Sequence, residues 1–232
     1  MPEVVYKSMK AAVYIATRNY YKDVLPSVKS LLLNSDVDKI VLLIEDDTFP
    51  YELPKRVMTV NASNQSYIRP DGPNVKNWWC WMVLLRGAYH RIFPDLDKIL
   101  SFDADAFAVR DISELWDLDM TDYYTAEVRE PKLSTPERTY FNAGVMMMNL
   151  EKLRDGTGDR IIEELNTKFH RYPEQDCYTE FCKGKILELP SEYNFAYFTA
   201  PCDDPKIIHY ADTKDWREKP IVKQFRDMEW PK

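Results

Sequence analysis

The carboxylates of Asp103 and Asp105 are the two groups in this sequence whose type and spacing most clearly permit chemistry. They follow the short apolar run 99–102, and the chain turns apolar again directly after them. Such a run is typical of a strand buried on both faces of a parallel sheet, and open α/β sheets bind ligands beyond the carboxyl ends of their strands. Two aspartates one residue apart at that place can bind a hard divalent cation through oxygen. The alternative is a plain acidic turn after a strand, because short motifs also match by chance.

A third ligand for such a cation could come from His209, one of only three histidines, at the end of the short apolar strand Ile207-Ile208-His209. A catalytic cation keeps positions open for substrate, typically for phosphate oxygens. Lys214 and Lys219 follow closely and could neutralise the charge of a departing diphosphate. A histidine after a strand is more often structural, and the two lysines also fit a solvated surface segment. Both interpretations stay open on these residues alone.

Length and composition indicate one globular domain whose partner is not nucleic acid. The chain has 232 residues, of which 45% are hydrophobic and 30% charged, and its net charge is −7 without basic clusters. Affinity for nucleic acid comes mainly from neutralising phosphates, so this charge argues against such a partner. The sequence shows no signal peptide and no apolar run long enough to form a transmembrane segment. We therefore expect a cytoplasmic protein whose four cysteines are free thiols.

The elements that must position these residues alternate between strands and helices. Apolar runs at 11–16 and 40–44 predict two strands, and the helical spacing over 20–34 predicts a helix between them, which implies a right-handed parallel crossover. The fold class is therefore α/β with a mostly parallel central sheet. The remaining predictions are strands at 99–102, 123–128, 143–148 and 206–209, helices at 77–91, 158–169 and 173–183, and loops at 61–77 and 129–140. Within the first of these helices, Trp78 and Trp81 are expected on one buried face, which leaves Trp79 free to be exposed.

Six motifs, in order over roughly residues 11–220, resemble those of glycosyltransferase family 8, the glycogenin-like and lipopolysaccharide galactosyltransferase-like group. The segments are Ala16-Thr-Arg-Asn-Tyr20, Lys76-Asn-Trp-Trp-Cys-Trp81, Phe102-Asp-Ala-Asp105 with Asp111-Ile-Ser-Glu-Leu-Trp116, Phe141-Asn-Ala-Gly-Val-Met-Met-Met-Asn-Leu150, Glu174-Gln-Asp176 and His209-Tyr210. The resemblance implies a GT-A fold, a Rossmann-like nucleotide-diphospho-sugar transferase domain. It further implies one domain over 1–232, with a nucleotide-binding part at about 8–110 and an acceptor part at about 111–232.

The resemblance also implies a metal and a nucleotide site. Asp103, Asp105 and His209 would hold Mn²⁺, with Mg²⁺ as the alternative, against the diphosphate of a UDP-sugar. The residues that would contact the nucleotide and its phosphates are Ala16, Thr17, Asn19, Lys76, Asp103, Ala104 and Lys214. The C-terminal motif is one residue shorter than is usual in the family and carries Asp215 where relatives have proline. Lys219 is therefore a rival to Lys214 as the diphosphate ligand.

The sugar and the reaction are implied in the same way. Asn142 and Ala143 would contact the donor sugar, Gln175 would lie near the anomeric centre, and Asp176 would bind sugar or acceptor hydroxyls. Family members retain the anomeric configuration. A double displacement needs a carboxylate nucleophile, whereas the amide Gln175 favours attack on the same face of the sugar. Glu127 and Asp176 stay open as nucleophiles. The acceptor can be a glycan, a lipid-linked saccharide, a protein or a small molecule, and loops 61–76 and 129–140 are its expected contacts or lids.

Two other classes of protein share parts of this pattern. A sugar-nucleotide pyrophosphorylase would use a related sheet and a metal, but it needs a glycine-rich phosphate loop after the first strand. Residues 16–34 contain no glycine, which disfavours that class. A catalytically inactive nucleotide-sugar- or glycan-binding protein of the same fold is the second alternative. The presence of Asp103, Asp105, Gln175 and His209 together argues against it.

Overall fold

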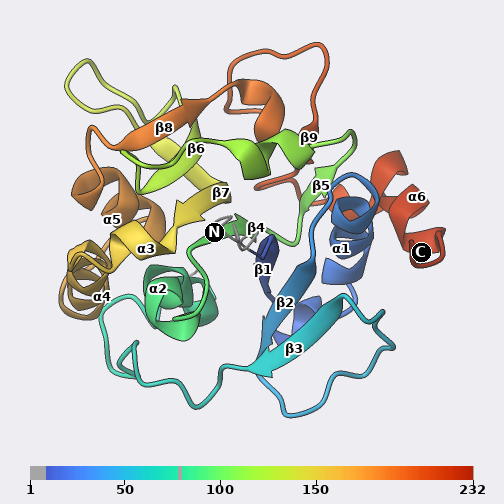
Figure 1. Ribbon diagram of the computed structural model, residues 1–232, viewed down its shortest axis with the longest axis horizontal. Coiled ribbons are helices and arrows are strands. Elements are labelled where there is room, and N and C mark those ends of the chain that lie inside the picture. The colour runs from blue at the N-terminus through green and yellow to red at the C-terminus, as the bar shows by residue number, and fades with distance from the viewer. Residues whose placement is uncertain (1–8, 78–79, 232) are drawn as a thin grey trace, which may run out of the picture.

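A seven-stranded sheet forms the centre of the computed structural model, which describes residues 9–77 and 80–231 (Figure 1). Its strands are β1 (Ala11–Ile15), β2 (Lys39–Ile44), β3 (Val57–Asn61), β4 (Lys98–Phe102), β6 (Thr125–Arg129), β7 (Phe141–Asn149) and β8 (Ile186–Leu189). Their order across the sheet is β3-β2-β1-β4-β7-β6-β8. Strands β1 to β4 pair in parallel, as do β6 and β8, whereas β7 is antiparallel to both of its neighbours. The predicted α/β class with a mostly parallel sheet is confirmed.

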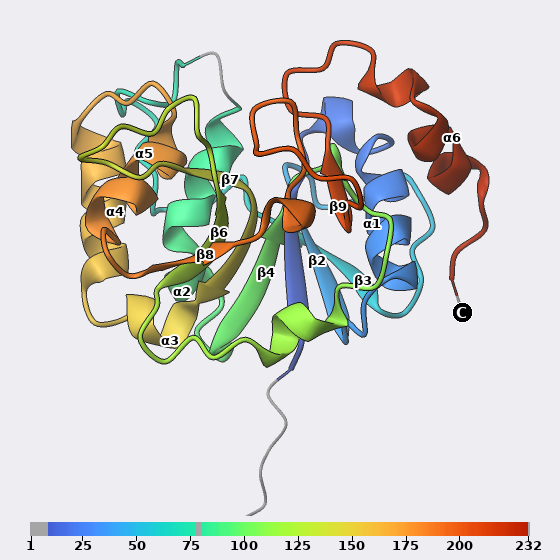
Figure 2. The same cartoon turned by 90° about the horizontal axis from the view of Figure 1, so that it is seen from above.

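Helices cover both faces of this sheet. The helices are α1 (Val24–Leu33), α2 (Tyr89–Ile92), α3 (Leu150–Leu153), α4 (Thr157–Thr167), α5 (Pro173–Phe181) and α6 (Pro220–Asp227). Helices α1 and α6 lie on one side, and α2, α4 and α5 lie on the other, as Figure 1 and Figure 2 show. Alternate residues of β1 explain this arrangement, because Tyr14 packs into the core under α1 while Val13 packs into the core under α4 and α5.

A small second sheet lies beside the carboxyl end of β4. It consists of β5 (Ala106–Ala108) and β9 (Ile207–His209), which pair antiparallel with Ala106 opposite His209. Five short 3₁₀ helices complete the described elements: η1 (Arg18–Tyr20), η2 (Trp81–Ala88), η3 (Ser113–Asp117), η4 (Ser191–Tyr193) and η5 (Trp216–Glu218). The pairing of β5 with β9 joins segments from the middle and the end of the chain.

The structure corrects the predicted helix over 77–91. The segment is the 3₁₀ helix η2 followed by the single α-helical turn α2, and the predicted places of Trp78 and Trp79 lie outside the described residues. A Cβ atom at Gly87 would meet the side chains of Leu165 and Ile161, so the segment packs against α4 through its backbone. Strands β3, β5 and β8 and helix α6 were absent from the prediction. The short strands are stabilised by pairing with distant partners, which local sequence patterns do not report.

The four cysteines are free thiols in the structure, in agreement with the expectation. Across residues 9–77 and 80–231, no helix combines the length and apolar character needed to span a bilayer.

Glu127 on β6 carries a carboxyl group that is buried between the sheet and the helical layer over it. The residue is only 1% exposed, and its Oε1 finds no hydrogen-bond partner among the described residues. It lies opposite Met146 of β7, within the core that α5 covers. Burial raises the pKa of Glu127 to about 7, against the opposing influence of the Thr125 hydroxyl and the Arg86 guanidinium. In the folded protein Glu127 is therefore a neutral carboxylic acid below that pH.

The protein is expected to lose stability through Glu127 as the pH rises from about 4.5 to about 7. The unfolded chain releases this proton first, so the folded state binds more protons in that window, and the loss approaches about 3 kcal/mol. Glu127→Gln imitates the protonated form and should be more stable than the wild type at pH 8 but not at pH 5. Urea unfolding of both proteins at the two pH values measures this. If the two proteins differed in unfolding free energy by the same amount at pH 5 and at pH 8, the raised pKa of Glu127 would be contradicted.

Candidate active site

The end of β4 and the end of β9 bring together three side chains that could hold a metal ion. Asp103 and Asp105 follow β4, and the register of β5 with β9 places His209 opposite Ala106. His209 Nε2 lies 3.3 Å from Asp105 Oδ1 and 3.7 Å from Asp103 Oδ2. One ligand atom from each residue falls within 4.8 Å of the others. The motif at 103–105 is therefore part of a three-residue cluster, and not an isolated acidic turn.

The charges of this cluster depend on one another. Burial raises the pKa of Asp103 above its ordinary value, although Arg86 and His209 pull it down. Burial acts the same way on Asp105, but the attraction of His209 outweighs it and lowers the pKa of that carboxyl. For His209, burial is overcome by the two carboxylates, and its pKa is raised. The cluster thus concentrates negative charge where a cation can replace a proton.

The donor set fits a divalent cation. His209 Nδ1 is 2.8 Å from Asn194 Oδ1, so this hydrogen bond occupies Nδ1 and leaves Nε2 directed at the carboxylates. Two carboxylates and one imidazole nitrogen suit Mn²⁺ or a similar cation and leave coordination positions for substrate oxygens. Asp103, Asp105 and His209 would hold it.

The His209 ring packs directly against the backbone of Gly144 on β7. A Cβ atom built at Gly144 would lie on the imidazole, closer than real Cβ atoms approach their neighbours. The carbonyl oxygen of Gly144 also accepts a hydrogen bond of 2.8 Å from Asp103 N. This single glycine therefore supports two of the three candidate ligands.

Gly144→Ala is expected to displace the His209 ring and to lower kcat/KM by roughly 10- to 100-fold, as for other changes that misplace a metal ligand. The matched control is Gly156→Ala, because nothing lies within 4 Å of a Cβ there and its strain comes only from a φ of 104°. Sugar-transfer rates and thermal unfolding of both variants separate the two effects. If Gly144→Ala lost no more activity than Gly156→Ala, the packing argument would be wrong.

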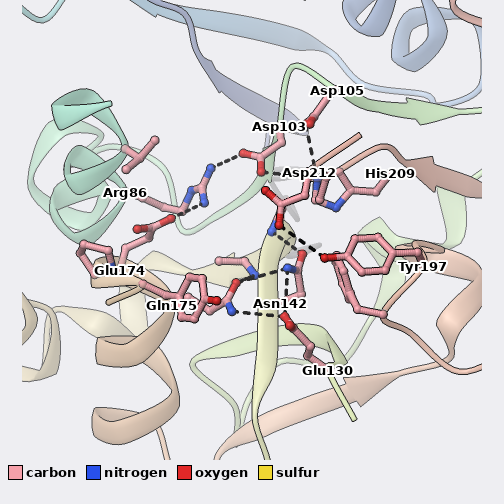
Figure 3. Close-up of a pocket in the computed structure, with 17 residues that line it drawn as sticks. Arg86, Asp103, Asp105, Glu130, Asn142, Glu174, Gln175, Tyr197, His209 and Asp212 are labelled. Atoms are coloured by element: carbon pink, nitrogen blue, oxygen red, sulfur yellow. Dashed lines mark hydrogen bonds and ion pairs between the residues drawn. The ribbon is translucent and has the colours of Figure 1, made fainter. Parts of the chain in front are cut away.

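A cavity of about 180 Å³ adjoins the cluster and is lined by polar side chains (Figure 3). Arg86, from η2, forms its charged wall: its guanidinium donates to Asp103 Oδ1 at 2.5 Å and to Glu174 Oε1 at 3.0 Å. The Arg86 side chain is only 4% exposed, so these two carboxylates compensate a buried charge. Such a charge between the candidate metal site and the cavity can bind an anionic or hydroxylated ligand.

Gln175, in the first turn of α5, forms the opposite wall with two residues of β7. Its Oε1 accepts hydrogen bonds from Ala143 N at 2.9 Å and from Asn142 Nδ2 at 3.3 Å. Its Nε2 lies 3.3 Å from Glu130 Oε2. The structure thus brings Gln175, Asn142 and Ala143 together with the acidic cluster, as Figure 3 shows for the labelled side chains.

Asp176 points to a different environment from Gln175, because adjacent helical residues lie on different faces. Its carboxylate accepts hydrogen bonds from Tyr140 Oη at 2.5 Å and from Tyr172 N at 3.1 Å. It does not belong to the lining of the cavity. A role for Asp176 in binding hydroxyls stays a prediction.

Three of the residues predicted to bind the nucleotide, Ala16, Thr17 and Asn19, lie just after the carboxyl end of β1 and outside this cavity. Ala16 follows β1 and is buried, with its N–H donated to Leu43 O at 3.0 Å. Thr17 precedes η1 and Asn19 lies exposed within it. Because β1 and β4 are parallel neighbours, this turn and Asp103 emerge at the same edge. Their contacts with a nucleotide stay predictions.

Ala104, Lys76 and Lys214 complete the predicted set. Ala104 is partly buried against the core on the α1 side. Lys76 and Lys214 are exposed, and neither lines the cavity. Lys219, which precedes α6, is partly buried and does not line the cavity either, so the choice between the two C-terminal lysines stays a prediction.

Sequence reasoning missed several residues that line or support the site. Arg86 carried a signal, because a lone arginine within the apolar segment 82–88 indicates a buried charge with a partner. The sequence predicted Glu130 only as part of the loop 129–140, and it gave no indication of Asn194. Their positions depend on contacts between distant segments, so the sequence offers no local signal for them.

Solved structures with a similar fold are glycosyltransferases. The chain superposes on the glycosyltransferase GlyE of Streptococcus pneumoniae TIGR4 with a TM-score of 0.74 at 21% identity, over 96% of this chain and 61% of that one. The galactosyltransferase LgtC, in complex with donor and acceptor sugar analogs, gives a TM-score of 0.71 at 17% identity, over 93% and 95%. These similarities show that the chain has the GT-A fold.

Sequence comparison narrows this class. Residues 12–220 match the sequence profile described as glycosyl transferase family 8. Lipopolysaccharide 1,2-glucosyltransferase of Escherichia coli K12 is 30% identical, over 92% of this chain and 75% of the relative. General stress protein A of Bacillus subtilis 168 is 26% identical, over 93% and 85%. The chain belongs to glycosyltransferase family 8, and the resemblance inferred from its motifs is confirmed.

Proposed function

We propose that the chain is a metal-dependent, retaining glycosyltransferase that moves a hexose-type sugar from a UDP-sugar to an acceptor hydroxyl. The observation that carries the proposal is the convergence of Asp103, Asp105 and His209 beside a polar cavity of sugar size. A GT-A glycosyltransferase takes its sugar from a nucleotide sugar, and the metal would neutralise the departing diphosphate. Mn²⁺ is the proposed cation, with Mg²⁺ as the alternative.

Each wall of the cavity has its own part in this scheme. Arg86 and Glu174 offer a donor and an acceptor, held in place by their ion pair, to the hydroxyls of the donor sugar. Asn142, Ala143 and Gln175 would border the other side of the sugar, with Gln175 nearest the anomeric carbon. Ala16, Thr17 and Asn19 would border the base and ribose, and Lys76, Ala104 and Lys214 the phosphate region. The roles of Arg86 and Glu174 rest on their place in the cavity wall, and the other roles come from the family resemblance.

The surroundings of the carboxylates favour a single displacement on one face of the sugar. Glu127 is buried in the core outside the cavity, and Asp176 is hydrogen bonded to Tyr140 away from it. Glu174 is paired with Arg86, and Glu130 Oε2 faces two amide groups. In the proposed step the bond from C1 to the diphosphate oxygen breaks as the acceptor oxygen bonds to C1. The acceptor proton passes to the departing diphosphate.

The acceptor is the substrate about which the similar proteins say least. One relative is a lipopolysaccharide glucosyltransferase, which makes a glycan or lipid-linked saccharide the first acceptor class to test here. Proteins and small molecules are the remaining classes. The loop 129–140 contributes Glu130 to the cavity, which supports its proposed role in contacting the acceptor. The cytoplasmic location expected from the sequence stays a prediction.

A donor panel tests the proposal directly. The purified protein is incubated with Mn²⁺ and UDP-, GDP- or dTDP-sugars, and release of free nucleotide is measured with and without saccharide acceptors. We expect slow hydrolysis of one UDP-sugar, faster turnover with the right acceptor, and loss of both with a chelator. Nucleotide release at an unchanged rate in the presence of the chelator would overturn the metal-dependent mechanism. UDP-sugar binding that tightens with Mn²⁺ but never leads to turnover would instead identify a catalytically inactive binding protein of this fold.

A further inference from the structure

Asn194 is a fully buried polar residue that the proposed reaction does not use. It follows η4, and the next residue, Phe195, pairs with β9 through two backbone hydrogen bonds. Phe195 N donates to Ile207 O at 2.9 Å, and His209 N donates to Phe195 O at 2.8 Å. This pairing fixes the Asn194 side chain beside the imidazole of His209, with Oδ1 2.8 Å from Nδ1.

Two backbone N–H groups of β7 determine which way the nearby amides face, because a backbone N–H can only donate. Gly144 N donates to Asn142 Oδ1 at 3.0 Å, and Ala143 N donates to Gln175 Oε1 at 2.9 Å. Asn142 must therefore turn its Nδ2 toward Gln175 Oε1, at 3.3 Å. Neither amide can be reversed without placing an NH₂ group against a backbone N–H.

The same logic extends to Asn194 and His209. Asn194 Nδ2 lies 2.8 Å from Asn142 Oδ1 and donates to it, because that oxygen can only accept. Asn194 Oδ1 then faces His209 Nδ1, which must carry a proton to donate to it. A neutral His209 ring consequently presents the lone pair of Nε2 to the side of Asp103 and Asp105.

At its other end the chain of hydrogen bonds reaches a carboxylate. Glu130 Oε2 accepts from Asn142 Nδ2 at 3.4 Å and from Gln175 Nε2 at 3.3 Å. Every link thus donates in one direction, from the imidazole through Asn194 and Asn142 to Glu130. Figure 3 labels His209, Asn142, Gln175 and Glu130, which line the cavity.

We propose that Asn194 is a positioning residue that couples the metal site to the amides that border the sugar. It holds the His209 tautomer whose Nε2 is available to a cation, and its Nδ2 donates to Asn142 Oδ1, which holds the Asn142 amide in contact with Gln175. The inference rests on the metal-dependent function proposed above. Residues that hydrogen bond to a metal-binding histidine typically change metal affinity 10- to 100-fold when removed.

Two substitutions separate the two halves of this role. Asn194→Ala removes both hydrogen bonds, so we expect the Kd for Mn²⁺ to rise about 10- to 100-fold and turnover to fall. Asn194→Asp keeps an acceptor for His209 Nδ1 but offers no donor to Asn142. We expect Mn²⁺ affinity equal to that of the wild type or tighter, while kcat for UDP-sugar hydrolysis falls at least about tenfold, because the carboxylate at position 194 repels Asn142 Oδ1 and displaces the amide that borders the sugar.

Mn²⁺ binding is measured by the paramagnetic resonance signal of free Mn²⁺, on the protein alone and with UDP. Asn166→Ala is the matched control. Asn166 is a buried asparagine of α4, outside the cavity lining, that accepts from the backbone N–H of Arg69 and donates to the carbonyl of Tyr67. It should lose thermal stability without changing Mn²⁺ affinity.

The outcomes distinguish this inference from the proposed function. If the wild type binds Mn²⁺ and the Kd of Asn194→Ala for Mn²⁺ is within threefold of the wild-type value, the coupling role is overturned and the proposed function stands. Equal loss of Mn²⁺ affinity in Asn194→Ala and Asn194→Asp would also overturn it, because the acceptor at position 194 would then not matter. A wild type that binds no Mn²⁺ with or without UDP would overturn both.

Discussion

Replacing Asp105 by alanine is expected to abolish sugar transfer, with a loss of roughly 10³-fold in kcat/KM. Its carboxylate lies 3.3 Å from His209 Nε2 and supplies one of the three converging ligand atoms. Without it the remaining donors bind a divalent cation weakly, and the charge that develops on the departing diphosphate is no longer compensated. UDP release with Mn²⁺ and the correct donor sugar measures the loss, and Asp105→Asn should recover little of it because the negative charge is gone.

Asp111→Ala is the matched control for this experiment. Asp111 is exposed, and its Oδ1 accepts hydrogen bonds from Ser113 N at 2.9 Å and Ser113 Oγ at 2.6 Å at the start of η3. Its removal should cost about 1 kcal/mol of stability and no activity. Full activity in Asp105→Ala would exclude the carboxylate from the mechanism.

Replacing Arg86 by alanine should have the second largest effect, on stability as well as on activity. The guanidinium is the counter-charge of two carboxylates, Asp103 and Glu174, and its side chain is almost completely buried. Removing one partner of a buried ion pair typically costs about 3–5 kcal/mol, because the other charge stays desolvated. We expect the same change to lower kcat/KM by about 10²-fold or more, since the wall of the sugar cavity is lost.

Arg86→Lys refines this prediction, because an ammonium group cannot reach both carboxylates with the planar geometry of a guanidinium. It should be more stable than the alanine variant yet remain well below wild-type activity. Arg91→Ala is the control: Arg91 pairs with Asp159 on the surface, where loss of an ion pair costs about 1 kcal/mol or less. Urea unfolding and donor hydrolysis measure the two effects. Equal destabilisation by Arg86→Ala and Arg91→Ala would show that the burial of the pair is energetically irrelevant.

The parts of the fold that local patterns determine were predictable from the sequence. Apolar runs located β1, β2 and β4, and the helical spacing located α1, α4 and α5, with ends displaced by a few residues. The segment 81–92 was mistaken for a regular α-helix, since its apolar spacing does not report the close contact at Gly87. Strand β5 has three residues and depends on β9 for its pairing, so no local signal could have revealed it.

The site residues that belong to short sequence motifs were predictable, whereas the residues that hold them in place from distant segments were not. Asp103 and Asp105 stood out because two carboxylates follow a buried strand, and His209 because histidine is rare in this chain. The Glu130 and Asn194 side chains gain their positions only through hydrogen bonds to residues elsewhere in the fold. Ordinary asparagines and glutamates abound in loops, so their types alone carry little information.

The pairing of β5 with β9 has a consequence for the order in which the protein becomes active during its synthesis. All seven strands of the large sheet lie before residue 190, whereas His209 and Phe195, which hydrogen bonds to its backbone, lie after it. A nascent chain that has emerged only as far as β8 can complete the large sheet but lacks a candidate metal ligand. The enzyme is therefore expected to acquire its structural scaffold first and its catalytic competence last, when the C-terminal segment folds back onto β5.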